Sequence, residues 1–195
     1  MLRREPRTLL RWMLAVLTAV AILVQGAWSV LHGASLWNFV SFFTIESNLV
    51  AIVALVVPGA PLLRGAATLY ITITGIVYVL LLSGLEASLQ TTIPWVNIVV
   101  HYVTPVALLL DWVLEPAALA LPLVQVVMRW LVYPIAYLAY SLVRGALVGW
   151  YPYPFLDPGH GGYLTVARIS LVIAATTAAI AFALAAYARR RHAYS

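Results

Sequence analysis

Six long apolar runs dominate this sequence of 195 residues and limit what it can fold into. A helix needs about 20 predominantly apolar residues to cross the hydrocarbon core of a bilayer. Only 9% of the residues are charged, whereas a soluble domain carries about 25%, so the chain cannot cover a water-facing surface. The pattern predicts an all-α integral membrane protein, a six-transmembrane-helix bundle built as a single domain over residues 1–195. The predicted spans lie near residues 9–31, 37–57, 65–85, 95–114, 124–148 and 163–188.

Arginines at both ends of the chain predict its orientation in the membrane. The amino end carries Arg3, Arg4, Arg7 and Arg11, and the carboxyl end carries Arg189, Arg190 and Arg191. Basic residues stay on the cytoplasmic side, so both termini are expected to be cytoplasmic. Two ends on one side require an even number of spans, which agrees with six. The expected location is the cell (plasma) membrane, as a multi-pass protein.

Composition excludes several classes of function. The chain has no cysteine, which excludes disulfides, thiolate metal sites and a cysteine nucleophile. The formal net charge is +5, but the arginines lie at the ends of the spans and not on one soluble face. Membrane lipids are therefore the expected partners and nucleic acid is not. Nothing in the sequence predicts a cofactor.

A polar cluster lies inside the second run, in the stretch FFTIESNLV. Thr44, Ser47 and Asn48 share one helical face, because they are spaced i, i+3 and i+4. The fourth run contains His101 at a matching depth from the outer side, roughly 9 Å against 10 Å at 1.5 Å per residue. Asn97 precedes His101 by one helical turn. The site is therefore expected to face the outer leaflet.

These residue types fit acyl transfer from a lipid ester. A neutral histidine within hydrogen-bond reach can take the proton of a threonine hydroxyl and later return it to a leaving group. We therefore predict Thr44 as the nucleophile and His101 as its base. The residues expected to orient the imidazole or donate to an oxyanion are Ser47, Asn48 and Asn97.

Polar-tipped aromatic residues predict a pocket around this site. Tyrosines recur at helical spacing in the third and fifth runs, and a proline-rich outer segment, YPYPFLDPGHGG, follows the fifth. That segment either caps the pocket or forms a simple turn at the membrane interface. The predicted pocket and charge network comprises Glu46, Tyr78, Tyr137, Tyr140, Arg144, Asp157 and His160.

Two carboxylates are predicted to lie inside spans, Glu46 and Asp111. An unpaired charge there is costly, so each should pair or be protonated. Arg144 and Arg168 lie near the outer ends of their predicted helices and are the candidate partners of Glu46.

Three alternatives stay open at this point. Hydroxyl and amide side chains in membrane helices often bond a backbone carbonyl or a neighbouring helix, which would make the cluster purely structural. A transporter or lipid-binding protein would use Glu46, His101 and Arg144 as a ligand or proton pathway. A zinc hydrolase would use His32, His101 and His160, but their separations match no ligand spacing, and no metal site is predicted.

The chain resembles, as a prokaryotic member, the androgen-induced-protein family of six-span transmembrane threonine hydrolases. The matching pieces are FFTIESNLV in the second run, NIVVH with a proline soon after it, and WYPYPFLDP after the fifth run. Their order and spacing cover most of the chain. The last piece resembles a YPFLE-type segment of the animal members.

This resemblance implies a hydrolase of fatty acid esters of hydroxy fatty acids. It places the family's nucleophilic threonine on Thr44 and its histidine on His101. The chain departs from the animal members at Glu46-Ser47-Asn48, where they have an aspartate shortly after the threonine, and the proline after His101 is offset by about one position. The substrate expectation therefore extends to other lipid esters.

Overall fold

The computed structural model describes residues 5–57, 59–85 and 93–193, so Arg3 and Arg4 lie outside the described residues. Every regular element in these ranges is a helix, which confirms the all-α prediction. The chain divides into two compact units, Met1–Ala117 and Ala118–Ser195, and each is described by itself.

Five helices within the described ranges are long and apolar enough to cross a membrane, and they match five of the six predicted spans. Large apolar side chains on their outer faces are exposed, for example Leu23 at 70% and Leu171 at 71%. A water-soluble monomer rarely exposes apolar surface on this scale, so these faces suit lipid. The five helices are Pro6–Leu31, Pro61–Leu82, Pro94–Leu114, Leu123–Val148 and Gly162–Ala193.

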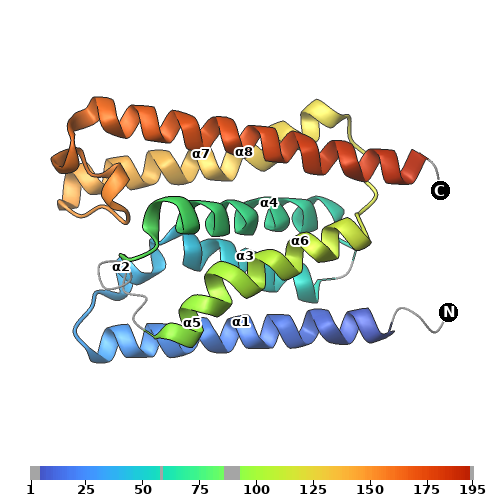
Figure 1. Ribbon diagram of the computed structural model, residues 1–195, viewed down its shortest axis with the longest axis horizontal. Helices are drawn as coiled ribbons and strands as arrows, with labels where there is room; N and C mark the ends of the chain where they lie inside the picture. Colours follow the sequence, from blue (N-terminus) through green and yellow to red (C-terminus); the bar gives the residue numbers. More distant parts are fainter. Residues whose placement is uncertain (1–4, 58, 86–92, 194–195) are drawn as a thin grey trace. The chain divides into compact units, whose positions relative to one another are not determined.

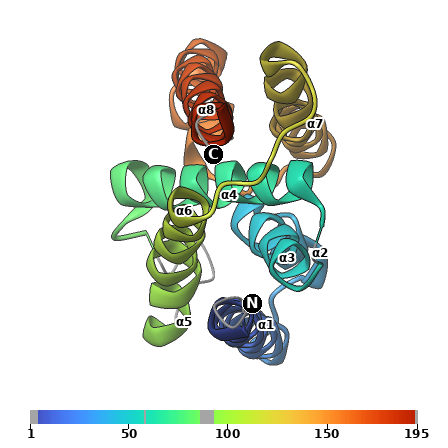
Figure 2. The same cartoon turned by 90° about the vertical axis from the view of Figure 1, so that its right-hand side faces the viewer.

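In the first unit α3 lies between α1 and α4 and packs against both (Figures 1 and 2). The helix formed by α5 and α6 runs beside α3 from α1, which α5 contacts, to α4, which α6 contacts. The π-helix η1 continues α4, and the π-helix η2 joins α5 to α6. The bounds are α1 Glu5–Leu31, α2 Leu36–Val40, α3 Phe43–Val56, α4 Pro61–Val77, η1 Tyr78–Leu82, α5 Pro94–Ile98, η2 Val99–Val103 and α6 Thr104–Leu114.

Small side chains allow these helices to approach closely. Ala15 of α1, Ala51 and Ala54 of α3 and Ala67 of α4 form one buried cluster with Ile71 and its neighbours. Inside a membrane the helices gain little from the hydrophobic effect, because lipid is as apolar as they are. Close van der Waals packing between small residues replaces it.

The second predicted span, residues 37–57, differs from the continuous helix expected there. It is interrupted at Ser41–Phe42, where Phe42 is extended with φ −77° and ψ 130°. The Ser41 hydroxyl donates to the Trp37 carbonyl at 2.6 Å, the carbonyl that the Ser41 N–H would meet in a continuous helix. The Ser41 N–H bonds Asn38 O instead. Serine side chains compete with the helix backbone in this way, and α3, with 14 residues, starts afresh at Phe43.

The second unit is a pair of helices, α7 (Leu123–Val148) and α8 (Gly162–Ala193), which pack against each other. Gly149 ends α7 with φ 71°, a conformation that favours glycine as a helix C-cap. The connection holds two short 3₁₀ turns, η3 (Pro154–Leu156) and η4 (Pro158–His160), and both contact α8. Figure 1 draws the pair in yellow to red.

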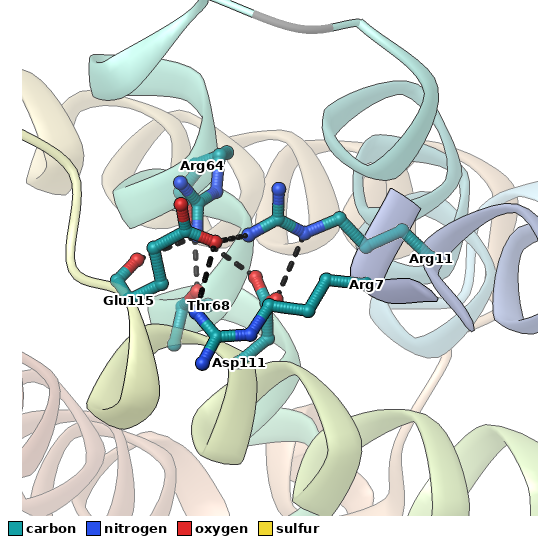
Figure 3. Close-up of polar contacts among 6 residues, drawn as sticks. All are labelled: Arg7, Arg11, Arg64, Thr68, Asp111 and Glu115. Carbon is teal, nitrogen blue, oxygen red and sulfur yellow. Dashed lines mark hydrogen bonds and ion pairs between the residues drawn. The ribbon is translucent and has the colours of Figure 1, made fainter. Parts of the chain in front are cut away.

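An ionic network fastens one end of the first unit (Figure 3). Asp111 of α6 bonds Arg11 Nε of α1 and Arg64 Nη2 of α4, each at 2.8 Å. Arg64 also donates to the Glu115 carbonyl at 2.8 Å, and Arg11 bonds the Glu115 carboxylate at 2.9 Å. The prediction that Asp111 is paired is confirmed. Arg7 lies 3.7 Å from the same Glu115 oxygen and is half exposed.

Candidate active site

Thr44 lies in the first turn of α3, directly after the break at Ser41–Phe42. Its side chain is buried, and the residue is 6% exposed. The amide groups at the start of a helix lack intrahelical acceptors, and the aligned peptide dipoles place positive potential there. The break therefore gives Thr44 a setting that a residue in mid-helix would not have.

His101 contacts Thr44 on one side and Asn97 on the other. Thr44 Oγ1 lies 3.2 Å from His101 Nε2, so the two residues matched by predicted depth are in direct contact. His101 Nδ1 lies 2.6 Å from Asn97 Oδ1. His101 and Asn97 are 3% and 9% exposed, so the three side chains form a continuous buried row.

The Asn97 amide defines which nitrogen of His101 carries the proton. Asn97 Nδ2 donates to the Tyr78 hydroxyl, which leaves Oδ1 facing the imidazole. An amide oxygen only accepts, so this orientation of the Asn97 amide assigns the proton to His101 Nδ1. Nε2 then carries the lone pair, and the Thr44 hydroxyl donates to it. This is the arrangement that a general base requires.

Two π-helices shape the cluster, η1 at Tyr78 and η2 around His101. In η2 the Thr104 N–H bonds Val99 O, five residues earlier. The same register would pair Val100 O with the next residue, Pro105, which has no N–H. Asn48 Nδ2 fills this place, since it donates to Val100 O at 3.2 Å and to Thr44 O at 2.8 Å.

Ser47 and Asn48 thus support the backbone of the site and do not touch the imidazole. Ser47 Oγ bonds Thr74 Oγ1 at 2.8 Å and Thr44 O at 3.2 Å, which ties α3 to α4. Of the three residues predicted to orient His101 or donate to an oxyanion, Asn97 is the one that contacts the ring.

Tyr78 belongs to the cluster more closely than the sequence indicated. Its ring stacks on His101 with centroids 3.9 Å apart and 14° between planes. The sequence pattern gave only a tyrosine stripe along the third run. The direct contact depends on the two π turns, which leave no periodic signal in the sequence.

Glu46 lies in the first turn of α3, where a carboxylate is favoured by the helix dipole. Its predicted pairing with Arg144 or Arg168 would join the two units and stays a prediction.

The remaining predicted pocket residues belong to the second unit, and their membership of the pocket stays a prediction. Tyr137 is buried and Tyr140 exposed, with ring centroids 6.5 Å apart. The Arg144 guanidinium lies 4.7 Å from the centre of the Trp150 ring, a cation–π contact.

The connection between α7 and α8 contains a local hydrogen-bonded turn. Asp157 accepts from the Gly159 N–H at 2.8 Å, and His160 Nδ1 lies 3.0 Å from the other carboxylate oxygen. Desolvation raises the pKa of Tyr151, and the nearby Tyr163 and Asp157 raise it further. The tyrosine therefore stays neutral at physiological pH.

A histidine metal centre finds no geometric support. Within residues 5–57, 59–85 and 93–193, no three histidine or acidic side chains converge as ligands. His32 instead bonds the Trp28 carbonyl at 2.8 Å and stacks on the Trp28 ring.

Comparison of the chain with protein-family models, curated proteins and solved structures finds no match.

Proposed function

We propose that this chain is an intramembrane lipid esterase in which Thr44 is the nucleophile and His101 its general base. The observation that carries the proposal is the buried row from Thr44 Oγ1 to His101 Nε2, at 3.2 Å, and from His101 Nδ1 to Asn97 Oδ1, at 2.6 Å. A nucleophile, a base and a group that orients the base recur in this order in unrelated hydrolases.

The first half of the reaction transfers the acyl group to the enzyme. Thr44 Oγ1 attacks the ester carbonyl carbon while His101 Nε2 takes the hydroxyl proton. The tetrahedral intermediate collapses when the bond to the alcohol oxygen breaks, and His101 gives its proton to that oxygen. The alcohol leaves, and the fatty acyl group stays esterified to Thr44.

Water completes the cycle. His101 takes a proton from water as its oxygen attacks the acyl carbonyl, and the proton then returns to Thr44 Oγ1. The net reaction converts one ester and one water into one fatty acid and one alcohol. Asn97 Oδ1 accepts the Nδ1–H throughout, which favours the imidazolium formed in each half.

The start of α3 adds electrostatic support. Negative charge develops on the carbonyl oxygen beside Thr44, and the positive end of a helix dipole stabilises negative charge. The interruption at Ser41–Phe42 creates this helix start inside the second run. A continuous helix would place Thr44 among paired peptide groups.

The proposed setting is the plasma membrane, with six crossings, both termini cytoplasmic and the site toward the outer leaflet. The ionic network of Arg7, Arg11 and Arg64 marks the inner end by the positive-inside rule. Asp111 follows His101 by ten residues along one helix, roughly 15 Å at 1.5 Å per residue. This separation supports a site well away from the basic end, and we propose that lipid esters enter sideways from the bilayer.

The resemblance to the androgen-induced-protein family supports fatty acid esters of hydroxy fatty acids as the first substrates to test. Other long-chain esters belong in the same panel, because Glu46-Ser47-Asn48 departs from the animal pattern.

Covalent labelling tests the proposal directly. Purified protein is treated with a lipophilic β-lactone or a fluorophosphonate, and the adduct is located by peptide mass spectrometry. We expect an adduct on Thr44 in the wild type and none in Thr44→Val, which keeps the shape and removes the hydroxyl. His101→Gln should slow the labelling by at least about 100-fold, the lower range for loss of a general base.

Thr177→Val is the matched control. Thr177 is also buried, and its hydroxyl bonds only its own helix, at the Ile173 carbonyl. This variant should label at the wild-type rate. Three results would refute the proposed function. The first is an adduct on a residue other than Thr44, and the second is a labelling rate that is unchanged in His101→Gln. The third is a folded wild type that neither labels nor hydrolyses any ester in the panel.

A further inference from the structure

Tyr78 contacts both His101, the proposed general base, and Asn97, the residue that orients it. Its ring lies face to face with the His101 imidazole at 3.9 Å, and its hydroxyl accepts the Asn97 Nδ2–H at 2.5 Å. Tyr78 is 2% exposed, and it starts the π-helix η1 at the end of α4. Neither contact takes part in a bond-making step of the proposed reaction, and the hydroxyl contact acts through the orientation of the Asn97 amide.

We propose that Tyr78 is the positioning residue of this site: its hydroxyl holds the Asn97 amide, and with it the His101 tautomer, while its ring stabilises the imidazolium. This inference rests on the proposed function for its effect on rate. The claim that Tyr78 holds the His101 tautomer rests on the geometry and not on the proposed function.

The hydroxyl acts through the amide. Asn97 can present either its oxygen or its nitrogen to His101, and the two choices give opposite tautomers. With Nδ2 bonded to the Tyr78 hydroxyl, Oδ1 faces Nδ1 and Nε2 is free to act as a base. Without the hydroxyl, Nδ2 loses its acceptor in a buried site, and rotation of the amide is no longer opposed.

The ring acts on the charge of His101. The face of an aromatic ring attracts a cation within about 6 Å of its centroid. His101 is neutral before reaction and becomes a cation when it takes the Thr44 proton. The stack is therefore stronger in the transition state than in the ground state, which is the condition for accelerating a reaction.

Tyr78 lies where the backbone departs from regular α-helix geometry. A π turn is rare and is often associated with functional sites. Gly75, one turn before Tyr78, lets α4 approach η2, since a Cβ there would lie 3.2 Å from the His101 carbonyl and 3.1 Å from Pro105 Cβ. The close approach brings the Tyr78 and His101 rings into contact.

Two variants separate the hydroxyl from the ring. Tyr78→Phe keeps the ring and removes the hydroxyl, and Tyr78→Leu removes both. We expect the rate of Thr44 labelling, and of hydrolysis of the best ester, to fall about tenfold in Tyr78→Phe and about 100-fold in Tyr78→Leu. Trp130→Leu is the control, because it removes a buried aromatic ring from the second unit.

Nitrogen NMR gives a readout that a merely structural role would not move. The protein is labelled with [¹⁵N]histidine, and the His101 signals are identified by their loss in His101→Gln. The wild type should show a protonated Nδ1 and an unprotonated Nε2. Tyr78→Phe should show a mixture of both tautomers.

The outcomes distinguish this inference from the proposed function. If Thr44 labels but Tyr78→Phe and Tyr78→Leu match the wild type in rate and in nitrogen spectrum, Tyr78 does not position His101 and the inference is wrong while the esterase survives. If the wild type forms no adduct, the esterase fails, and the nitrogen spectra still decide the inference. A single unchanged Nδ1–H tautomer in Tyr78→Phe overturns it.

Discussion

Replacing Asp111 with asparagine tests the ionic network that joins three helices of the first unit. The carboxylate bonds Arg11 of α1 through one oxygen and Arg64 of α4 through the other, both at 2.8 Å. The side chains of Arg11, Arg64 and Asp111 are 21%, 16% and 22% exposed, so the network is mostly withdrawn from solvent. Asp111→Asn keeps the shape and removes the charge.

The magnitude follows from this burial. Breaking a fully buried ion pair by neutralising one partner costs about 3–5 kcal/mol, whereas an exposed pair contributes about 0.2–1 kcal/mol. With about four-fifths of each side chain buried, and with the asparagine oxygen still able to accept one hydrogen bond, we expect a loss of about 2–3 kcal/mol.

Equilibrium unfolding in mixed micelles measures this loss. Glu115→Gln is the comparison. The Glu115 side chain is 40% exposed, so we expect the loss of its ion pairs with Arg11, at 2.9 Å, and Arg7, at 3.7 Å, to cost about 1 kcal/mol. A double-mutant cycle of Asp111→Asn with Arg64→Met should give a coupling energy above about 1 kcal/mol. A loss below about 1 kcal/mol for Asp111→Asn, or strict additivity in the cycle, would refute the network's role.

Two further predictions concern the backbone of the site. Ser41→Ala removes the hydroxyl bond to Trp37 O, and it should lower stability by about 1 kcal/mol and slow Thr44 labelling at least fivefold. Thr72→Ala loses the same kind of bond inside a continuous helix and should leave labelling unchanged. Equal labelling rates in the two variants would contradict the role of the break. Gly75→Val forces a side chain against Pro105 and the His101 carbonyl and should cost roughly 2 kcal/mol in the same unfolding assay, so a fully stable variant would show that α4 and η2 do not need their close approach.

Five of the six predicted spans, and the matching depth of Thr44 and His101, were accessible from the sequence because they depend on local quantities. Run length fixes how far a helix crosses the bilayer, and distance from the end of a run fixes depth. The same reasoning would have found Arg64 and Arg11 as partners of Asp111, since all three lie near the predicted inner end.

The break in the second span was not predictable by the same means. Apolar content continues across Ser41 and Phe42, and the hydropathy of the run is the same for one helix or two. The interruption depends on a single hydroxyl that competes for a carbonyl, an outcome decided by packing and not by composition. The π-helices were not predicted for a related reason. Each has five residues, which are too few to change the spacing of apolar residues along the run.

The irregular parts of the first unit converge on one place, and this convergence is the strongest structural argument that the polar row is a site. The break starts α3 one residue before Thr44, η2 surrounds His101, and η1 begins at Tyr78. In η2 the register places Val100 O opposite Pro105, which has no N–H, and a carbonyl without a donor is costly in a membrane. The Asn48 amide donates a hydrogen bond to Val100 O, whereas a bundle of regular helices would not need this bond. A sequence that served only to pack three helices would lose nothing by keeping them straight, so the distortions indicate that the positions of Thr44, His101 and Tyr78 matter more than regular helix geometry.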